Sequence, residues 1–485
     1  MFPCPAVRPA RRVLAATLWF CWALCAAVAA PAAAAETCAP VSYGTPQPAD
    51  APLRAEGSFL KDRAGRVVLL RGVNATGDAK VPPFRPLISP ASLAPLPGWG
   101  LNTVRLLFNW EAFEPTRCHY DDSYLAYYEQ VVSAAEALGL YVIVDFHQDA
   151  YSRFSLGGCG EGFPSWSVAS SIALQTPKND ASCASWGAAM LFDTSHHATW
   201  SAFHKDTEGA RTRYVAMVRA AADRLSRHAN VVGYELMNEP WGTDTELQAL
   251  YEGVGAAIRE RDPQRILFVP PHALVSSGMP DNNIPRVSFD NIVYAPHFYD
   301  ASVVIFNFWW GNSPASSLDR MLAKAGSWNA PMLLGEFGAN HGVGNVTGYM
   351  ESLYAWLDAR FVSGTQWSYT PGWTAAGKDG WNGEDLSIVD GSGATRPALF
   401  VPRPYPQKTA GTPGSFVRTG KGFTFSWTHV PGLGNTEVFL PAGYATGKAL
   451  SYPGSSVGVE CRITGQRLTC SGGRAGGASV TLSAP

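Results

Sequence analysis

The sequence carries little net charge and lacks the cysteine and histidine patterns that hold metal ions. Its 37 basic and 39 acidic residues give a formal charge of -2, which provides no electrostatic basis for binding nucleic acid. No Cys-x-x-Cys pair occurs, and the neighbouring His196 and His197 lack a third ligand at a usable spacing. We therefore expect neither a nucleic-acid partner nor a metal site.

The chain also lacks the composition of a disordered protein. Charged residues make up 16% and hydrophobic residues 46% of its 485 positions, as in ordinary globular proteins. Aromatic residues are plentiful, at 12% with 16 tryptophans. Tryptophan often lines sugar-binding grooves, although most such residues fill protein cores. The length allows one large domain and a small one.

The first 35 residues have the pattern of a secretory signal peptide. The apolar region Val13–Ala30 precedes the small-residue cleavage site Ala33–Ala35 and follows three arginines, Arg8, Arg11 and Arg12. An uncleaved anchor is the alternative, because the apolar stretch is nearly long enough to span a bilayer. We expect residues 1–35 to be removed and the mature protein to be secreted into the extracellular medium.

Cleavage would remove three of the nine cysteines and leave six, an even number that implies disulfides in an exported protein. Cys461 and Cys470 flank a turn-like segment, and Cys159 and Cys183 share one long loop. These positions favour two bridges and leave a third for the remaining pair, Cys38 and Cys118. The sequence alone does not fix the pairing.

Apolar, β-type runs alternate with segments in which apolar residues have helical spacing. Eight such runs occur, at Val67–Asn74, Thr103–Phe108, Tyr141–His147, Val231–Asn238, Ile266–Pro270, Ile292–Phe298, Met332–Phe337 and Gln366–Tyr369. Helices are predicted at Tyr124–Leu138, Arg211–His228, Glu246–Arg261, Leu318–Ala325 and Tyr349–Phe361. The alternation indicates an α/β fold, a (β/α)8 TIM barrel over residues 36–402, and continuous apolar strands suit such a parallel sheet.

An open, doubly wound sheet is the main alternative. It usually needs a glycine-rich phosphate-binding loop after the first strand, and Arg71-Gly72-Val73-Asn74 is not one. In a TIM barrel, functional groups gather at the carboxyl ends of the strands. Seven of the eight predicted strands end in candidates, which are Asn74, Arg105, His147, Asn238, Glu239, His297, Glu336 and Trp367. The fifth strand instead runs into two prolines.

Two of these strand ends carry glutamate motifs. Glu239 lies in Glu-Leu-Met-Asn-Glu-Pro-Trp at Glu235–Trp241, and Glu336 lies in Leu-Leu-Gly-Glu-Phe-Gly at Leu333–Gly338. Asn-Glu-Pro alone is a weak signal, because Glu before Pro is common at strand ends. Two carboxylates together can cleave a glycosidic bond, since one protonates the leaving group and the other attacks the sugar carbon.

The composition changes after Pro402. Arg403-Pro404-Tyr405-Pro406 leads into Gly- and Ser-rich sequence with short β-type runs such as Phe423–Trp427. This pattern predicts a small all-β sandwich domain over residues 403–485. The domain has a size at which it can carry its own core, and we favour packing against the barrel over carbohydrate binding as its role.

With Asn238, Glu239 and Glu336 at these positions, the chain resembles glycoside hydrolase family five, whose two carboxylates lie on the fourth and seventh barrel strands. The segments Arg71–Ala75 and Asp145–Asp149, the rest of the Asn-Glu-Pro motif and the appended β-domain narrow the resemblance to the endoglycoceramidases. This resemblance implies a retaining hydrolase that releases an intact oligosaccharide from ceramide. It also implies that no metal or other cofactor takes part.

The resemblance assigns the central chemistry to four residues. Glu336 would be the nucleophile and Glu239 the acid and then the base, with carboxyls about 5–5.5 Å apart. Arg105 and Tyr299 would hydrogen-bond Glu336 and hold its pKa down. Burial beside a charged partner would raise the pKa of Glu239 and keep it protonated.

The remaining assignments concern the sugar. Asn238 would hold the 2-hydroxyl, Trp367 would stack on the sugar face, and further contacts would come from Lys80, His147, Asp149 and His297. Simpler interpretations remain open, with Arg105 in a structural ion pair and the two histidines as satisfied core residues. Glu235 shares a strand face with Glu239 and is either structural or a helper to the acid.

The lipid part of a glycolipid substrate would need an apolar surface. Val303–Phe306 and Phe308–Trp310 follow the sixth predicted strand, where a barrel loop overhangs the cleft. If exposed, they would receive ceramide or touch a micelle or membrane surface, and the alternative is an ordinary buried segment. An insertion between Asp149 and Gly209 has the length of a functional rim or lid. We expect the protein to act as a monomer.

Three other functions compete. A β-glucosidase acting on glucosylceramide or sterylglucoside would differ only in the depth of its sugar site, and a β-1,4-glucanase of the same barrel family would have an open polar groove. A secreted carbohydrate-binding protein would keep the barrel without the chemistry, and the presence of both glutamates disfavours it.

Overall fold

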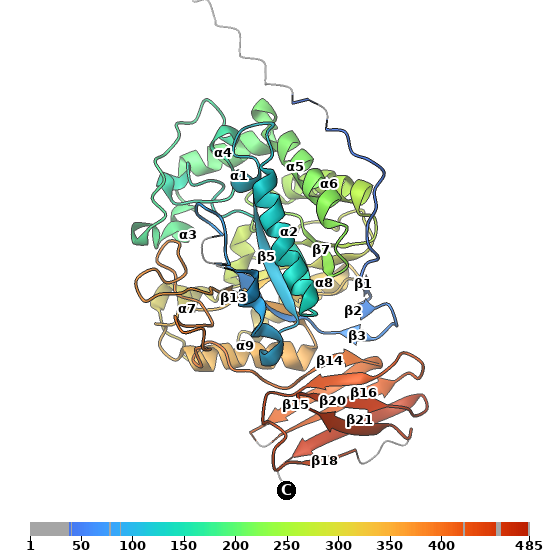
Figure 1. Ribbon diagram of the computed structural model, residues 1–485. Coiled ribbons are helices and arrows are strands. Elements are labelled where there is room, and N and C mark those ends of the chain that lie inside the picture. The colour runs from blue at the N-terminus through green and yellow to red at the C-terminus, as the bar shows by residue number, and fades with distance from the viewer. Residues whose placement is uncertain are drawn as a thin grey trace, which may run out of the picture. The chain divides into compact units, whose positions relative to one another are not determined.

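A ring of parallel strands covered by helices occupies the middle of the chain (Figure 1). The computed structural model describes residues 38–39, 41–76, 79–87, 89–420, 422–452 and 457–483. The predicted signal peptide, residues 1–35, lies outside the described residues. Within the described part, Cys38 onward forms one compact unit.

Eight strands pair in parallel in the order β11-β13-β4-β5-β6-β7-β8-β9. Their bounds are β4 Arg71–Ala75, β5 Thr103–Asn109, β6 Tyr141–His147, β7 Val231–Glu235, β8 Ile266–Val269, β9 Ile292–Tyr294, β11 Leu333–Leu334 and β13 Ser363–Tyr369. Two short strands, β10 (His297–Phe298) and β12 (Glu336–Phe337), pair with each other, and Tyr294 bridges Met332. These contacts close the ring between the sixth and seventh barrel strands, so the predicted TIM barrel is confirmed.

Helices connect the barrel strands and cover their outer side (Figure 1). The long ones are α2 Asp122–Ala137, α5 Ala210–Leu225, α6 Asp244–Arg261, α8 Ala315–Ser327 and α9 Val346–Arg360. Two of them begin with a side-chain cap, since the Asp121 carboxylate accepts from two backbone amides at the start of α2 and Thr243 and Glu246 form a capping box on α6. Short helices α1 Trp110–Phe113, α3 Trp186–Ala189, α4 Thr194–His204 and α7 Ala301–Phe306 lie in loops after the strands.

The first predicted strand is wrong in its first half. Val67–Val68 forms β3, which pairs with antiparallel neighbours outside the barrel, and the barrel strand begins only at Arg71. The chain passes from one sheet to the other within a single apolar run. Periodicity cannot divide such a run, because both of its halves are buried.

Two antiparallel sheets form the β-sandwich. One has the order β1-β2-β3-β14-β17-β20-β19 and the other β15-β16-β21-β18. Their strands are β1 Leu53–Glu56, β2 Phe59–Asp62, β14 Tyr405–Thr409, β15 Gly411–Thr419, β16 Gly422–His429, β17 Thr436–Phe439, β18 Ala449–Ser451, β19 Glu460–Thr464, β20 Arg467–Ser471 and β21 Gly476–Ser483. The first sheet therefore takes three strands from before the barrel, in addition to the segment after residue 403.

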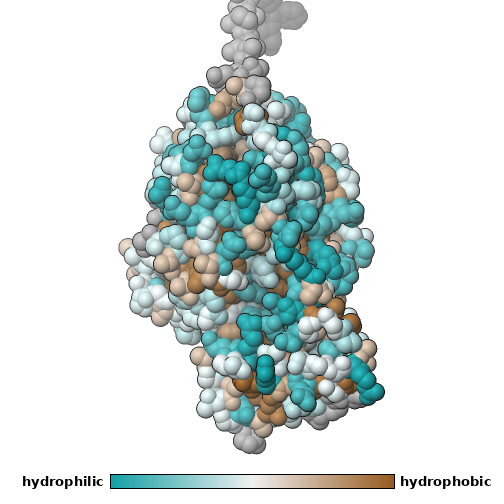
Figure 2. Space-filling view, turned by 45° about the vertical axis from the view of Figure 1, so that its right-hand side comes forward, coloured by the Kyte–Doolittle hydropathy of each residue, from teal (hydrophilic) through white to brown (hydrophobic). Residues whose placement is uncertain are grey.

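Hydrogen bonds join the sandwich to the barrel. The Tyr405 hydroxyl donates to the carbonyl of Gly100 at 2.6 Å, and the Gln466 amide donates to that of Gly98 at 2.9 Å. On the face shown in Figure 2, hydrophilic residues cover most of the barrel and hydrophobic ones form only small areas.

Three disulfides cross-link the chain, Cys38–Cys118, Cys159–Cys183 and Cys461–Cys470. They are the pairs that the sequence favoured. Among the described helices, none combines the length and the apolar character needed to cross a bilayer.

Candidate active site

The two motif glutamates meet at the carboxyl ends of the barrel strands. Glu336 opens β12 in register with His297 of β10, and Glu239 lies four residues beyond the end of β7. One carboxylate oxygen from each glutamate and one ring nitrogen of His297 all lie within 4.8 Å of one another. That separation is close to the spacing of about 5–5.5 Å that a retaining glycosidase uses, and well below the larger spacing of inverting ones.

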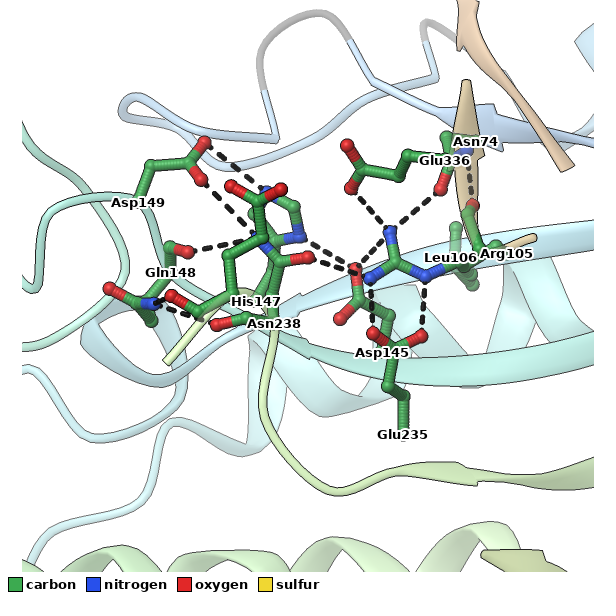
Figure 3. Close-up of polar contacts among 12 residues, drawn as sticks. Asn74, Arg105, Leu106, Asp145, His147, Gln148, Asp149, Glu235, Asn238 and Glu336 are labelled. Atoms are coloured by element: carbon green, nitrogen blue, oxygen red, sulfur yellow. Dashed lines mark hydrogen bonds and ion pairs between the residues drawn. The ribbon is translucent and has the colours of Figure 1, made fainter. Parts of the chain in front are cut away.

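Arg105 of β5 is the hub of the site, and Figure 3 shows acidic and amide side chains around its guanidinium. It donates one hydrogen bond to Glu336 Oε1 at 2.7 Å and two hydrogen bonds to the Glu235 carboxylate at 2.6 and 2.8 Å. Further bonds of 2.8 Å reach Asn74 and Asn238. The guanidinium is fully buried, so these contacts must satisfy its charge and fix its orientation.

Glu336 is held as a carboxylate by its neighbours. The Tyr299 hydroxyl donates to its Oε2 at 2.8 Å, and His297 Nδ1 lies 3.5 Å from the same oxygen. Burial alone would raise the pKa of Glu336, but the positive charges of His297 and Arg105 outweigh it and lower that pKa. An ionised, oriented carboxylate is what a nucleophile requires.

Glu239 has the opposite environment. Burial raises its pKa, and the charge of Glu336 adds to the effect, although His297 at 3.0 Å opposes it. Its backbone has a φ of 34°, in the left-handed region, so the chain turns sharply at this residue. The Gln148 amide donates to the carbonyls of Asn238 and Glu239 at 2.7 and 3.0 Å and holds that turn. The side chain remains 13% exposed, enough to meet a leaving group.

Lys80 and Asp149 form a buried ion pair beside the two glutamates. The Lys80 ammonium also lies 4.3 Å from the ring centre of Trp367 and 3.9 Å from that of Trp381. Burial opposes the charge of Asp149, yet Lys80 and His147 lower its pKa. The other Asp149 oxygen accepts from Asn238 at 3.2 Å, which connects this pair to Arg105. Aromatic faces beside fixed charges suit the two sides of a sugar ring.

His147 lies behind these groups. Its ring stacks against Trp367 with centres 5.6 Å apart, and Nδ1 lies 2.6 Å from Asp145. Burial opposes its charge, but Asp145 and Glu161 raise the pKa of His147 to about 10. The ring nitrogens are buried, so His147 supports Trp367 and Asp149 from within the protein.

All ten residues predicted for the site lie together at this edge of the barrel. Arg105 and Tyr299 reach Glu336, His297 lies between the two glutamates, and Glu235 is the buried partner of Arg105. Sequence reasoning missed three neighbours, Glu161, Trp381 and Glu384. The glycines on both sides of Glu161 were the one signal available, since they indicate a tightly packed backbone.

Two groups of described side chains bring ligand-type atoms together, Glu239–His297–Glu336 and His147–Asp149–Glu161. In each group a buried cation already pairs with a carboxylate, Arg105 with Glu336 and Lys80 with Asp149. A divalent ion would have to displace that cation. The donors therefore suit proton transfer and sugar binding better than metal ligation.

Two family models match the chain. Residues 62–372 match the family described as Cellulase (glycosyl hydrolase family 5), and residues 403–481 match the Glycoside hydrolase family 5 C-terminal domain. Endoglycoceramidase I of Rhodococcus hoagii (strain 103S) is 28% identical over 459 residues, which cover 84% of this chain and 85% of that protein. A Glucosylceramidase of Aspergillus fumigatus is 32% identical over 143 residues, 24% of this chain and 18% of that protein.

One solved structure bears on the chemistry of the family. It is described as the lactosyl-enzyme intermediate of Endo-glycoceramidase II from Rhodococcus sp.. It matches with a TM-score of 0.71 and 25% sequence identity, over 88% of this chain and the whole of that one.

Proposed function

Because the chain belongs to glycoside hydrolase family 5, we propose that it is a retaining hydrolase that cleaves the bond between oligosaccharide and ceramide in glycosphingolipids. The observation that carries this proposal is the Glu239–Glu336 pair, with oxygens within 4.8 Å and pKa values shifted in opposite directions. Two carboxyls that differ in this way can act as acid and nucleophile at one pH.

The reaction then takes two displacements. The Glu336 carboxylate attacks the anomeric carbon while Glu239 gives its proton to the glycosidic oxygen, so ceramide leaves with a hydroxyl group. Glu239, now a carboxylate, removes a proton from water, and the resulting hydroxide attacks the sugar carbon and frees Glu336. Two inversions give net retention. Tyr299 and Arg105 keep one oxygen of Glu336 aimed at the carbon throughout.

The choice of a glycolipid substrate rests on the relatives and on one surface. The Rhodococcus hoagii relative, an endoglycoceramidase by name, matches over most of both chains. The apolar patch, formed by Val304, Ile305, Phe306, Phe308 and Trp310, begins five residues after the active-site Tyr299. Four of its side chains are 62–69% exposed and Phe308 is 41% exposed. The alternative of a buried segment therefore does not hold for these residues, although Val303 of the same predicted segment is buried.

We assign the apolar patch to the hydrocarbon part of the substrate, at a micelle or membrane surface. Phe306 and Phe308 both pack against Trp310, with ring centres 5.3 and 5.2 Å apart, so the aromatic side chains form one continuous surface. Isolated exposed apolar residues are common in proteins, but a contiguous group beside a catalytic site marks an interaction surface. Burying each such side chain in lipid would gain about 1.5–3 kcal/mol.

Removing two aromatic side chains from the patch should separate lipid binding from chemistry. We expect Phe306→Ser with Trp310→Ser to lower kcat/KM on micellar lactosylceramide at least about tenfold, because burial energy of this size is lost. Hydrolysis of soluble p-nitrophenyl β-lactoside should change less than about twofold. Val417→Ser is the matched control, since Val417 is an exposed aliphatic residue of β15 in the sandwich. Equal losses on both substrates would refute the assignment.

A glucosylceramide-cleaving β-glucosidase is the second candidate, because the Aspergillus fumigatus relative has that name. The two functions differ in whether a second sugar fits beyond the first. Trp186 of α3 packs against Trp381 and donates to Glu384 at 3.1 Å, so the insertion meets the loop after β13 beside Lys80. This contact either lines a second sugar site or closes the cleft after one sugar.

One experiment tests the proposed function against its alternatives. Purified mature protein is given a ganglioside, lactosylceramide, glucosylceramide or carboxymethylcellulose, and the products are identified. We expect intact oligosaccharide and ceramide from the first two. Glucose from glucosylceramide alone would indicate the β-glucosidase, cleavage of cellulose alone would indicate a glucanase, and no reaction on any of them would contradict the proposal.

We also propose that the protein is secreted after loss of residues 1–35 and acts as a monomer. Three disulfides support an oxidising destination. A single chain supplies Glu239, Glu336 and every partner described above, so the chemistry does not require a second copy.

A further inference from the structure

Glu161 is a buried carboxyl group that the proposed reaction does not use. It belongs to the insertion after β6, two residues beyond Cys159 of the Cys159–Cys183 disulfide. Its backbone pairs with that of Asp149, through N–H to carbonyl bonds of 3.1 and 2.7 Å in the two directions. These hydrogen bonds hold the insertion against the end of β6, next to Asp149 of the predicted sugar site.

The glycines on both sides of Glu161 allow its backbone to lie close against that strand end. A Cβ atom at Gly160 would clash with the carbonyl oxygen of Ser152 at 2.5 Å, and a Cβ atom at Gly162 would clash with the Cα of Gln148 at 2.5 Å. Gly162 also has a φ of +108°, which other residues rarely adopt. The position of the Glu161 side chain is therefore set by close backbone packing.

The carboxyl of Glu161 faces the groups that support the sugar site. One oxygen accepts from the Asn109 amide at 3.1 Å, and the other lies 3.4 Å from His147 Nε2. Neither that oxygen nor that nitrogen has a hydrogen-bond partner within the described part of the chain. Nε2 also lies 3.6 Å from Asp149 Oδ2, so this nitrogen lies between two carboxyl groups.

We infer that Glu161 is a positioning residue for the first-sugar site, which it shapes through His147 and Asp149. This inference rests on the proposed function, because it assumes that Asp149 and Lys80 bind the sugar. As a neutral acid, Glu161 leaves His147 and Lys80 to balance the charge of Asp149. As a carboxylate, it would repel Asp149 and compete with it for both cations.

Charges from three neighbouring segments act on Glu161. His147 and Asp145 face it from β6, Asp149 faces it from the loop after β6, and Lys80 faces it from the loop after β4. Burial is the largest influence and Asp149 adds to it, while His147 and Lys80 oppose them, and the pKa of Glu161 rises to about 8. The neutral form therefore predominates at pH 7 and is lost as the pH rises through 8.

The test measures sugar binding without turnover. In a Glu239→Gln background, which removes the titration of the acid, the Kd for methyl β-lactoside is measured by calorimetry at several pH values. We expect the Kd to rise about tenfold between pH 7 and pH 9, because only the neutral form of Glu161 holds the site correctly. Adding Glu161→Gln should keep the Kd within about twofold over that range.

Two further variants separate positioning from simple structural support. Glu161→Leu should bind weakly at every pH, because it cannot accept the Asn109 bond, whereas Glu161→Gln should restore binding. Asp379→Asn is the matched control. Burial raises the pKa of Asp379 to about 7, and its carboxyl accepts from the Leu386 amide at 2.7 Å. In the Asp379→Asn variant, the Kd should still rise about tenfold between pH 7 and pH 9.

The inference would be overturned if the Kd of the Glu161→Gln variant still rose about tenfold between pH 7 and pH 9. It would also be overturned if Asp379→Asn abolished this rise as completely as Glu161→Gln does. Absence of lactoside binding at every pH would also overturn it. Failure of the proposed function has a different signature: the wild-type protein would release no oligosaccharide from glycolipids, whatever the pH dependence of binding.

Discussion

Replacement of Glu336 by glutamine is expected to lower kcat/KM by a factor on the order of 10⁵ to 10⁶, as loss of a nucleophile does in other enzymes. The amide cannot attack the anomeric carbon, and it cannot carry the negative charge that Arg105 and His297 are arranged to hold. The loss should be similar for lactosylceramide and for soluble aryl lactosides, because the attack is common to both. Rates with both substrates measure it.

Two controls make this result specific to the nucleophile. Glu351→Gln removes a half-exposed carboxylate of α9 that pairs with Arg403 at 2.8 Å, and activity should be retained. With Glu336→Gly, added azide should restore activity and give an α-glycosyl azide, because a single attack from the vacated side inverts the sugar carbon. Activity of Glu336→Gln above about one per cent of wild type would exclude Glu336 as the nucleophile.

Replacement of Glu239 by glutamine should have an effect that depends on the leaving group. With lactosylceramide we expect kcat/KM to fall by about 10²- to 10⁴-fold, the usual contribution of a general acid. With 2,4-dinitrophenyl β-lactoside, the first step needs no proton and should be nearly unaffected. The second step still lacks its base, so the glycosyl-enzyme should accumulate and a burst of dinitrophenol should appear.

The pH dependence of kcat should change in the same variant. The pKa of Glu336 is lowered and that of Glu239 is raised, so the reactive form exists between them. As the pH falls through the lower pKa, Glu336 is protonated and activity is lost. As the pH rises through the higher one, Glu239 loses its proton and activity is lost again. Glu239→Gln should abolish the alkaline limb of kcat and keep the acid limb. Equal losses of activity with lactosylceramide and with 2,4-dinitrophenyl β-lactoside would contradict the assignment of Glu239 as the acid.

The sequence was sufficient to predict the barrel because most barrel strands are short apolar runs bounded by turns, and the long helices have helical apolar spacing. The family resemblance, which was based on the strand-end motifs, is confirmed by the family match over residues 62–372. The prediction failed at Val67–Val68, where one apolar run enters two sheets. The join between β1–β3 and the later strands of the sandwich depends on contacts between distant segments, which local patterns do not contain.

The strand-end residues of the site could be predicted for a related reason. The carboxyl ends of parallel strands meet at one edge, so the strands bring Arg105 and Glu336 together. Glu161 and Glu384 could not be found in this way, because they lie in loops. Their places depend on the Cys159–Cys183 bridge, on the pairing of Glu161 with Asp149 and on the bond from Trp186 to Glu384. Such tertiary contacts leave no periodic signal in the sequence.

The measurement that tests the central claim most directly is proton NMR of lactosylceramide micelles during the first minutes of hydrolysis. The proposed mechanism predicts that intact lactose appears first as its β-anomer, together with ceramide, and only later mutarotates. Initial release of the α-anomer would contradict retention by Glu239 and Glu336. Release of galactose or glucose in place of lactose would contradict cleavage between oligosaccharide and ceramide.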